Sequence, residues 1–328
     1  MRNFYIICKE NIASGIGVIA CDVLCSCLFA KQNNLIPIVD MKHYRNQYFK
    51  KNRTFKDNAW EYFFTQPNKY SLDHIKEDDN VIIGNFSDSK EVKLFFDTDW
   101  IPKKPKEEDI KKRKEKENLR EFLNFSETTN DYIKKTHKEI IGDKENILGI
   151  LIRGTDYTER RTYKENIQPT IKEVIKKIKE YQKKYPEIEY IYLATEDANI
   201  YEKMKKEFGD ILLDNKQKRY SYKKNDPFLL EVKTDREDNN YYLALEYLSS
   251  LYILSKCKYF IGGRNNGTRF AYILQKNWKD FYIWELGRYG KTIKEYLFSY
   301  VTHRIGKTDY KIYNILGLRL KFKIKKGD

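Results

Sequence analysis

The sequence predicts an α/β protein whose sheets are parallel and covered by helices. Short apolar runs alternate with longer helical segments along most of the chain, which is typical of a doubly wound sheet. Residues 147–152 form an uncharged, mostly apolar run that stops at Arg153, as expected of a strand buried on both faces of a parallel sheet. The chain also opens with a strand, a Gly-containing loop, an apolar helix and a second strand, which predicts a right-handed βαβ unit.

The first part of the chain predicts a Rossmann-like domain, which we place at residues 1–145. Its predicted elements are a strand, a helix and two further strands, in the order Phe4–Cys8, Val18–Lys31, Leu35–Val39 and Val81–Gly84. Residues 102–118 are dense in Lys, Arg and Glu, which indicates either a charged helix or a solvated connector.

The second part alternates more regularly and predicts a doubly wound domain at residues 146–300. Strands are expected at 147–152, Tyr190–Ala194, Ile211–Leu213, Tyr259–Ile261 and Phe281–Trp284. Helices are expected at 168–184, 198–207, Asn239–Ser255 and in a segment that ends at Gln275. A chain of 328 residues is long enough for two such domains facing each other across a cleft.

The last segment, residues 301–328, is a basic tail. Its residues 318–325 alternate apolar and basic side chains, so an extended chain would present one apolar and one cationic face. This pattern suits either an edge strand or contact with an anionic membrane surface.

Composition narrows the class of protein. Lys and Arg total 63 against 48 Asp and Glu, and this net charge of +15 attracts polyanions: nucleic acid, anionic lipid or phosphate-bearing substrates. No stretch reaches the roughly 20 apolar residues of a membrane span. Five cysteines, an odd number, indicate reduced thiols in a cytoplasmic protein. Because the spacing of Cys21, Cys25 and Cys27 matches no zinc pattern and no His lies near them, no metal site is predicted.

Three polar segments each follow a predicted strand of the second domain: Arg153–Asp156, Thr195–Asp197 and Gly262–Thr268. Since the carboxyl ends of parallel strands lie at one edge of the sheet, where ligands of such folds bind, we expect these segments to converge. The Arg153 guanidinium is suited to a phosphate. Alternatively, Arg153 and Asp156 simply pair with each other in a loop.

The third segment is a Gly-rich turn before a helix. Its backbone N–H groups and the helix dipole could receive a pyrophosphate, with added charge from Arg264 and Arg269. Glycines and asparagines are also ordinary turn formers. In the second segment, Glu196 and Asp197 could accept hydrogen bonds from ribose hydroxyls or guanine N–H groups, while Asp197 is equally suited to cap the following helix.

These segments together resemble a known enzyme family. Ile150-Leu151-Ile152-Arg153-Gly154-Thr155-Asp156 resembles the His-x-Arg-Arg/Gly-x-Asp signature of the α-1,6-, protein-O- and nodulation-type fucosyltransferases. Tyr192–Asp197 is similar to their Leu-Ala-Thr-Asp-Asp segment, and Ala244–Tyr272 is similar to the helix and strand that precede their nucleotide loop. The order and spacing of all three agree over residues 145–285.

The resemblance implies a GT-B fold, two Rossmann-like domains facing across a cleft, with GDP-fucose as donor and no metal. The domain of residues 1–145 would then lie on the acceptor side. By this resemblance Arg153 would hold the donor β-phosphate and steady the departing GDP, and Asp197 would contact guanosine. The turn from Arg264 to Thr268 would receive the diphosphate. Leu151 stands where the family has its His, so that contact to the nucleotide is missing or comes from elsewhere, and the donor sugar is left open.

The predicted site has a catalytic and a donor-binding part. The catalytic residues are Arg153, Asp156 and Glu159; Glu159 is a candidate base with Asp156 and Glu165 as rivals, and is equally compatible with pairing to Arg160 or Arg161 in a solvated loop. The donor-binding residues are Gly15, Gly17, Arg153, Glu196, Asp197, Gly263, Arg264, Asn265, Asn266, Gly267, Thr268 and Arg269.

Two other functions compete with this one. Gly15-Ile16-Gly17-Val18-Ile19-Ala20 fits the dinucleotide fingerprint, with Asp40 as its acidic residue, which would indicate an NAD-dependent oxidoreductase. Residues 9–14, however, separate the first glycine from its strand, whereas the fingerprint turn follows its strand closely. A basic nucleic-acid-binding protein is the second alternative, although the sequence has none of the signatures of such folds.

We therefore predict a cytoplasmic glycosyltransferase of polysaccharide biosynthesis. It would transfer fucose from GDP-fucose to a surface or capsular glycan, lipid-linked or protein-bound, without a metal. Peripheral contact with the inner face of an anionic membrane is compatible with its basic tail.

Overall fold

The computed structural model describes residues 1–8, 14–44, 46–85, 101–223, 226, 229–232, 234–276, 278–290, 297–305, 308–316 and 318–323. Ile324 and Lys325 of the alternating tail, and residues 9–13 before the first glycine, lie outside these ranges. The chain divides into two compact units, one of residues 1–160 and 168–286 and one of residues 161–167 and 287–328.

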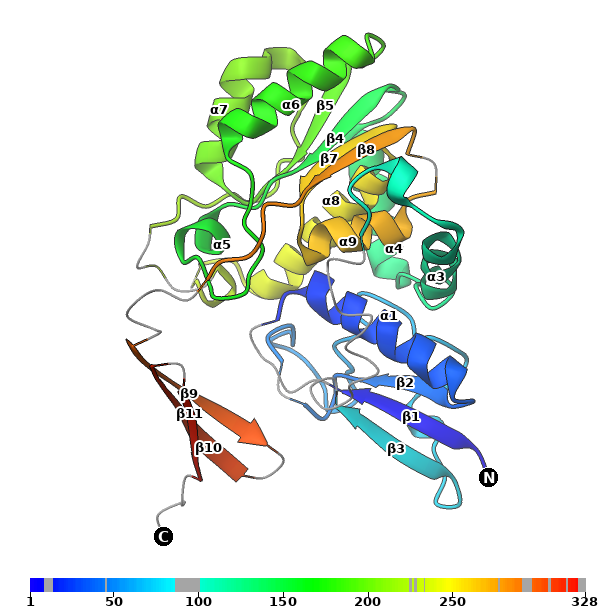
Figure 1. The fold of residues 1–328 in the computed structure, drawn as a ribbon. Helices are drawn as coiled ribbons and strands as arrows, with labels where there is room; N and C mark the ends of the chain where they lie inside the picture. The colour runs from blue at the N-terminus through cyan, green and yellow to red at the C-terminus, as the bar shows by residue number, and fades with distance from the viewer. Residues whose placement is uncertain are drawn as a thin grey trace. The chain divides into compact units, whose positions relative to one another are not determined.

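A three-stranded parallel sheet opens the first unit (Figure 1). Its strands are β1 (Asn3–Cys8), β2 (Ile36–Asp40) and β3 (Asn80–Asn85), in the order β2-β1-β3. Helix α1 (Ile16–Gln32) connects β1 to β2. The predicted opening βαβ unit is therefore confirmed, with element ends that differ by one or two residues.

A five-stranded parallel sheet forms the rest of this unit's framework. The strand order is β6-β5-β4-β7-β8, with bounds β4 Ile147–Leu151, β5 Tyr190–Ala194, β6 Leu212–Leu213, β7 Tyr259–Gly263 and β8 Asp280–Trp284. In the register, Leu151 at the end of β4 is opposite Ala194 of β5 on one side and Gly262 of β7 on the other. The three strands that carry the predicted site are thus neighbours and end at the same level.

Helices cover both faces of the five-stranded sheet (Figure 1). On one face lie α6 (Ile171–Lys184) and α7 (Ala198–Phe208), and on the other α8 (Asn239–Lys256) and α9 (Asn266–Leu274). Successive side chains of β4 alternate accordingly: Leu148 and Ile150 pack in the core under α6, and Ile147 and Leu151 pack in the core under α8. The prediction of an α/β fold with a doubly wound parallel sheet is confirmed.

Helix α1 is apolar all round because it is covered on several sides. It contacts its own sheet as well as α3 (Ile110–Arg120), α8 and α9. One continuous core runs from Tyr5 and Ile7 of β1 through α1 to Phe260 of β7, so the two parallel sheets share their hydrophobic interior. The predicted boundary at residue 145 falls within this compact unit and stays a prediction.

Some elements were not specified by the sequence pattern. Helix α3 favours the helical alternative for the charged segment, whereas α4 (Glu127–Ile140) and the short α5 (Thr155–Glu159) were not predicted. Four 3₁₀ turns complete the described elements: Leu72–His74, Pro105–Glu107, Gly209–Ile211 and Leu229–Glu231. No helix among the described residues is long and apolar enough to cross a membrane.

The second unit contains a three-stranded antiparallel sheet in the order β11-β10-β9. Its strands are β9 (Phe298–Ile305), β10 (Thr308–Ile315) and β11 (Leu318–Lys323). Residues 161–167 join this unit through backbone hydrogen bonds, including Tyr289 N to Glu165 O at 2.9 Å. The alternating tail therefore forms an edge strand, one of the two structures that its pattern predicts.

Candidate functional site

The loops that follow β4, β5 and β7 meet at the carboxyl edge of the five-stranded sheet. The first two are joined directly, because the Gly154 N–H donates to Glu196 Oε1 at 3.1 Å and the Thr155 N–H donates to Asp197 Oδ2 at 3.0 Å. The segment between β4 and α6 also contacts the third loop, because Gln168 Nε2 donates to the Arg264 carbonyl at 2.9 Å. The expected convergence of these three segments is confirmed.

Arg153 pairs with Glu196 across two loops. Its Nε lies 3.3 Å from Glu196 Oε1, its side chain is 21% exposed, and the guanidinium lies over the Tyr157 ring at 5.2 Å from the centroid. Burial disfavours the charge of Arg153, but the negative charges of Glu196 and of nearby groups outweigh burial and raise its pKa. Asp156 Oδ1 accepts a hydrogen bond from Thr155 Oγ1 at 3.0 Å. Arg153 therefore stays charged and pairs with Glu196 of the neighbouring loop. It is not limited to a local pair with Asp156.

Asp197 connects the first two loops and caps a helix. Its Oδ1 accepts from the Ile200 N–H at 3.0 Å, at the start of α7, while Oδ2 accepts from Thr155. A Cβ on Gly154 would lie 2.5 Å from Asp197 Oδ2, so this close approach requires glycine. Of the two roles left open for Asp197, the structure shows the cap; the contact with guanosine stays a prediction.

The Gly-rich turn after β7 is built by its own side chains. Asn265 caps α9 through Oδ1, which accepts from the Thr268 N–H at 2.9 Å, and Thr268 Oγ1 donates to the Gly263 carbonyl at 2.6 Å. Asn265 and Thr268 are 3% and 0% exposed. Their side chains shape the turn, and the backbone N–H groups of Asn266 and Gly267 remain at the positive end of the helix, where anions bind.

The two arginines of this segment lie in different surroundings. The Arg264 guanidinium lies 3.7 Å from Glu285 Oε1. Arg269 is 1% exposed, and its Nη2 donates to Cys25 Sγ of α1 at 3.1 Å. Burial works against the charge of Arg269, whereas Cys25, Cys21 and Asp22 raise its pKa above the ordinary value. The structure therefore places Arg269 between α9 and α1.

Tyr247 of α8 belongs to the site although the sequence analysis did not select it. A Cβ on Gly17, in the first turn of α1, would lie 3.0 Å from Tyr247 Cε1, and a Cβ on Gly267 would lie 2.1 Å from the Tyr247 hydroxyl oxygen. Burial raises the pKa of Tyr247, while the positive charge of Arg153 opposes that shift. The N-terminal ends of α1 and α9 thus meet at one phenol beside Arg153. The sequence feature that could have pointed to this contact is the glycine in the first turn of each helix, Gly17 in α1 and Gly267 in α9.

The remaining predicted residues are less tightly integrated. Gly15 is the N-cap of α1 and has open space around the position of a Cβ. Glu159 is exposed at the end of α5, and Asp156 is half-buried. Glu165 belongs to the second unit. The identity of a catalytic base therefore stays a prediction.

Asp40, the acidic residue of the dinucleotide fingerprint, closes a turn after β2. Its Oδ1 accepts from the Lys42 and His43 N–H groups at 2.9 and 3.0 Å, and its Oδ2 lies 2.9 Å from His43 Nδ1. The Asp40 carboxylate is 4% exposed and binds groups of its own loop. This favours a structural role over ribose binding. Across the described ranges, no group of three or more His, Cys, Asp or Glu side chains could hold a metal ion.

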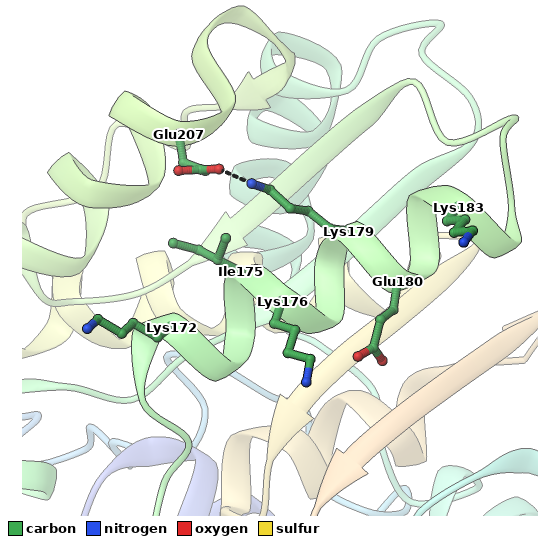
Figure 2. Close-up of a pocket in the computed structure, with 7 residues that line it drawn as sticks. All are labelled: Lys172, Ile175, Lys176, Lys179, Glu180, Lys183 and Glu207. Atoms are coloured by element: carbon green, nitrogen blue, oxygen red, sulfur yellow. Dashed lines mark ion pairs between the residues drawn. The ribbon is translucent and has the colours of Figure 1, made fainter.

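The hollows that lie away from these loops include the following two. One of about 590 Å³ is lined by residues of α6 and by Glu207 of α7, which pairs with Lys179 (Figure 2). The other, of about 840 Å³, lies among α3 and the C-terminal ends of α8 and α9. The long Lys side chains of the first hollow are typical of a solvated helix face.

Comparison with known proteins finds similarity among solved structures. No protein-family model and no curated protein matches the chain. Solved structures of fucosyltransferases have a similar chain path.

Three of these structures illustrate the similarity. Fucosyltransferase NodZ from Bradyrhizobium has a TM-score of 0.48 at 13% identity, over 84% of this chain and 94% of that chain. A mutant of Arabidopsis thaliana FUT1 in complex with GDP has a TM-score of 0.48 at 10% identity, over 84% and 69% of the two chains. POFUT1 in complex with GDP has a TM-score of 0.46 at 12% identity, over 85% and 96%.

Proposed function

We propose that the protein is a GT-B glycosyltransferase that takes a sugar from a nucleotide diphosphate, with GDP-fucose as the donor. The observation that carries this proposal is the meeting of Arg153 with the N-terminal ends of α1 and α9 at Tyr247. A guanidinium and two helix N-termini together form a site for a doubly charged anion. Glu196 holds the guanidinium at 3.3 Å from its carboxylate.

The chemistry of sugar transfer uses such a site. Breaking the bond between the sugar and the β-phosphate leaves negative charge on the departing diphosphate. Donors that are already in place and largely covered from water stabilise that charge more than solvent would. In this proposal Arg153 binds the β-phosphate, and the first N–H groups of α9 bind the oxygens beside it, so that metal-independent transfer is feasible.

The guanine preference rests on the motif resemblance and on the carboxylates that follow β5. Glu196 accepts from Gly154 and pairs with Arg153, so guanosine would have to use its remaining lone pairs or those of Asp197. Leu151, in place of the family His, is 2% exposed, and its Cδ2 would lie 3.2 Å from a Cβ on Gly267. It therefore packs under the start of α9 and cannot supply a polar contact.

Thermal unfolding with a panel of donors tests the proposal. GDP-fucose at a hundred times its dissociation constant should stabilise the protein by about 2.7 kcal/mol, because it binds the native state alone. We expect smaller shifts with UDP-, dTDP- and CMP-sugars, and the same GDP-fucose shift in the presence of EDTA. Equal shifts with all donors would refute the guanine preference, and no shift with any nucleotide sugar would refute the glycosyltransferase proposal.

We also propose that the second unit brings the enzyme to an anionic membrane that carries a lipid-linked glycan acceptor. Residues 287–328 contain eleven Lys or Arg and three Asp or Glu. Leu318, Leu320 and Phe322 alternate along β11 and are 70%, 46% and 54% exposed. An apolar strand face within a cationic segment has the composition of a peripheral membrane contact.

Vesicle sedimentation tests this contact. The protein should sediment with vesicles that contain phosphatidylserine and remain in solution with neutral vesicles. Replacing Leu320 and Phe322 with serine should weaken binding about tenfold or more, given about 25 cal/mol per Å² of apolar surface. Matched serine substitutions at the exposed Phe55 and Ile110 serve as the control, and equal sedimentation of both double variants would contradict the proposal.

A further inference from the structure

Tyr247 lies where three separate parts of the first unit come together. It belongs to α8, and it contacts the first turn of α1 at Gly17 and the first turn of α9 at Gly267. A Cβ would approach the hydroxyl to 2.1 Å at Gly267, which is too close without a shift of the ring, and the ring to 3.0 Å at Gly17, which is a tight contact. The two glycines therefore let both helix ends close onto the same phenol.

The phenol is also linked electrostatically to the centre of the site. The positive charge of Arg153 and the negative charge of Glu196 both act on Tyr247. Arg153 Nε lies 3.3 Å from Glu196 Oε1. The phenol that contacts both helix ends is therefore also close to this charged pair.

We propose that Tyr247 is a positioning residue of the diphosphate site, whose phenol spaces the first turns of α1 and α9. This inference rests on the proposed function and deepens it. It assigns to Tyr247 the recognition of the β-phosphate through the two helix ends, and not the recognition of the nucleoside.

The contact at Gly267 allows a test of the geometry by rescue. After the hydroxyl oxygen at 2.1 Å, the next atoms around a Cβ on Gly267 are Asn265 Oδ1 at 3.1 Å and Leu151 Cδ2 at 3.2 Å. Removing the hydroxyl thus removes the one severe clash. Gly267→Ala should lower the unfolding temperature, and Tyr247→Phe in the same chain should recover most of that loss. A double variant no more stable than Gly267→Ala would overturn the proposed packing.

Binding of GDP and GMP tests the role itself, because the two nucleotides differ only in the β-phosphate. Tyr247→Phe should weaken GDP binding about tenfold, because loss of the hydroxyl contact at Gly267 lets the first turn of α9 shift away from the β-phosphate, and should leave GMP binding unchanged. Tyr242→Phe, on the same helix with its side chain 43% exposed, should change neither.

The outcomes separate this inference from the proposed function. Equal weakening of GDP and GMP in Tyr247→Phe would overturn the positioning role while leaving the transferase proposal in place. A wild-type protein that binds neither nucleotide would overturn both. Isothermal calorimetry on the full chain gives the two dissociation constants directly.

Discussion

Replacing Arg153 with alanine is expected to lower the kcat of sugar transfer about 100- to 1,000-fold, the usual effect of removing one preorganised donor to a developing charge. The fold should persist, because Glu196 keeps its hydrogen bonds from the Gly154 N–H and from Thr155 Oγ1. Steady-state kinetics with GDP-fucose, together with a circular dichroism spectrum of the variant, measure both parts.

Two further variants test whether Arg153 acts through its charge alone, through its planar guanidinium or through its position. Arg153→Lys keeps the charge but loses the planar fork, so we expect activity between those of the wild type and the alanine variant. Arg113→Ala removes the same charge from α3, where the side chain is 60% exposed, and should leave kcat unchanged. If Arg153→Ala turned over donor as fast as wild type, the site assignment would fail.

Asp22→Ala is expected to destabilise the protein by about 1–3 kcal/mol, because it removes a buried carboxylate whose negative charge helps to compensate the buried Arg269 guanidinium. Asp22 of α1 is 5% exposed and Arg269 of α9 is 1% exposed, and the charge of Asp22 helps to raise the pKa of Arg269. Urea unfolding monitored by tryptophan fluorescence gives the change in free energy.

The double variant Asp22→Ala with Arg269→Met separates loss of charge pairing from loss of packing. Because no buried charge is then left behind, we expect it to recover part of the stability that Asp22→Ala loses. Asp210→Ala is the matched control, since the Asp210 side chain is fully exposed at 109% relative area beside Lys205. A loss below about 1 kcal/mol in Asp22→Ala, within the usual range of surface substitutions and modest defects, would show that Arg269 has other adequate counterions.

Much of the fold follows from patterns that operate over a few residues. Uninterrupted apolar runs such as 147–151 indicate strands buried on both faces, and the structure has β4 there at the centre of its sheet. The starts of α7 and α9 could also be predicted, because Asp197 and Asn265 are residue types that favour helix N-caps and they cap these helices in the structure. From parallel strands alone, the convergence of the three loops could be expected.

The parts that the sequence did not reveal depend on packing between distant segments. Arg269 has the same charge as Arg264, and only the contact of α9 with α1 directs it to Cys25. Tyr247 is one of 27 tyrosines, and nothing local distinguishes it from the others. Helix α4 has mostly polar residues and few apolar ones, so its sequence pattern resembles that of a surface loop. Each of these features requires knowledge of which surfaces meet.

The shared core around α1 determines when the proposed anion site can form during protein synthesis. Gly17 emerges from the ribosome early, whereas Tyr247 and Gly267 follow more than two hundred residues later. A nascent chain that stops before α9 has neither the second helix end nor the Arg269 charge that acts on Asp22. Under the proposed function, nucleotide binding is therefore a property that the chain acquires late, after its translation has passed residue 274.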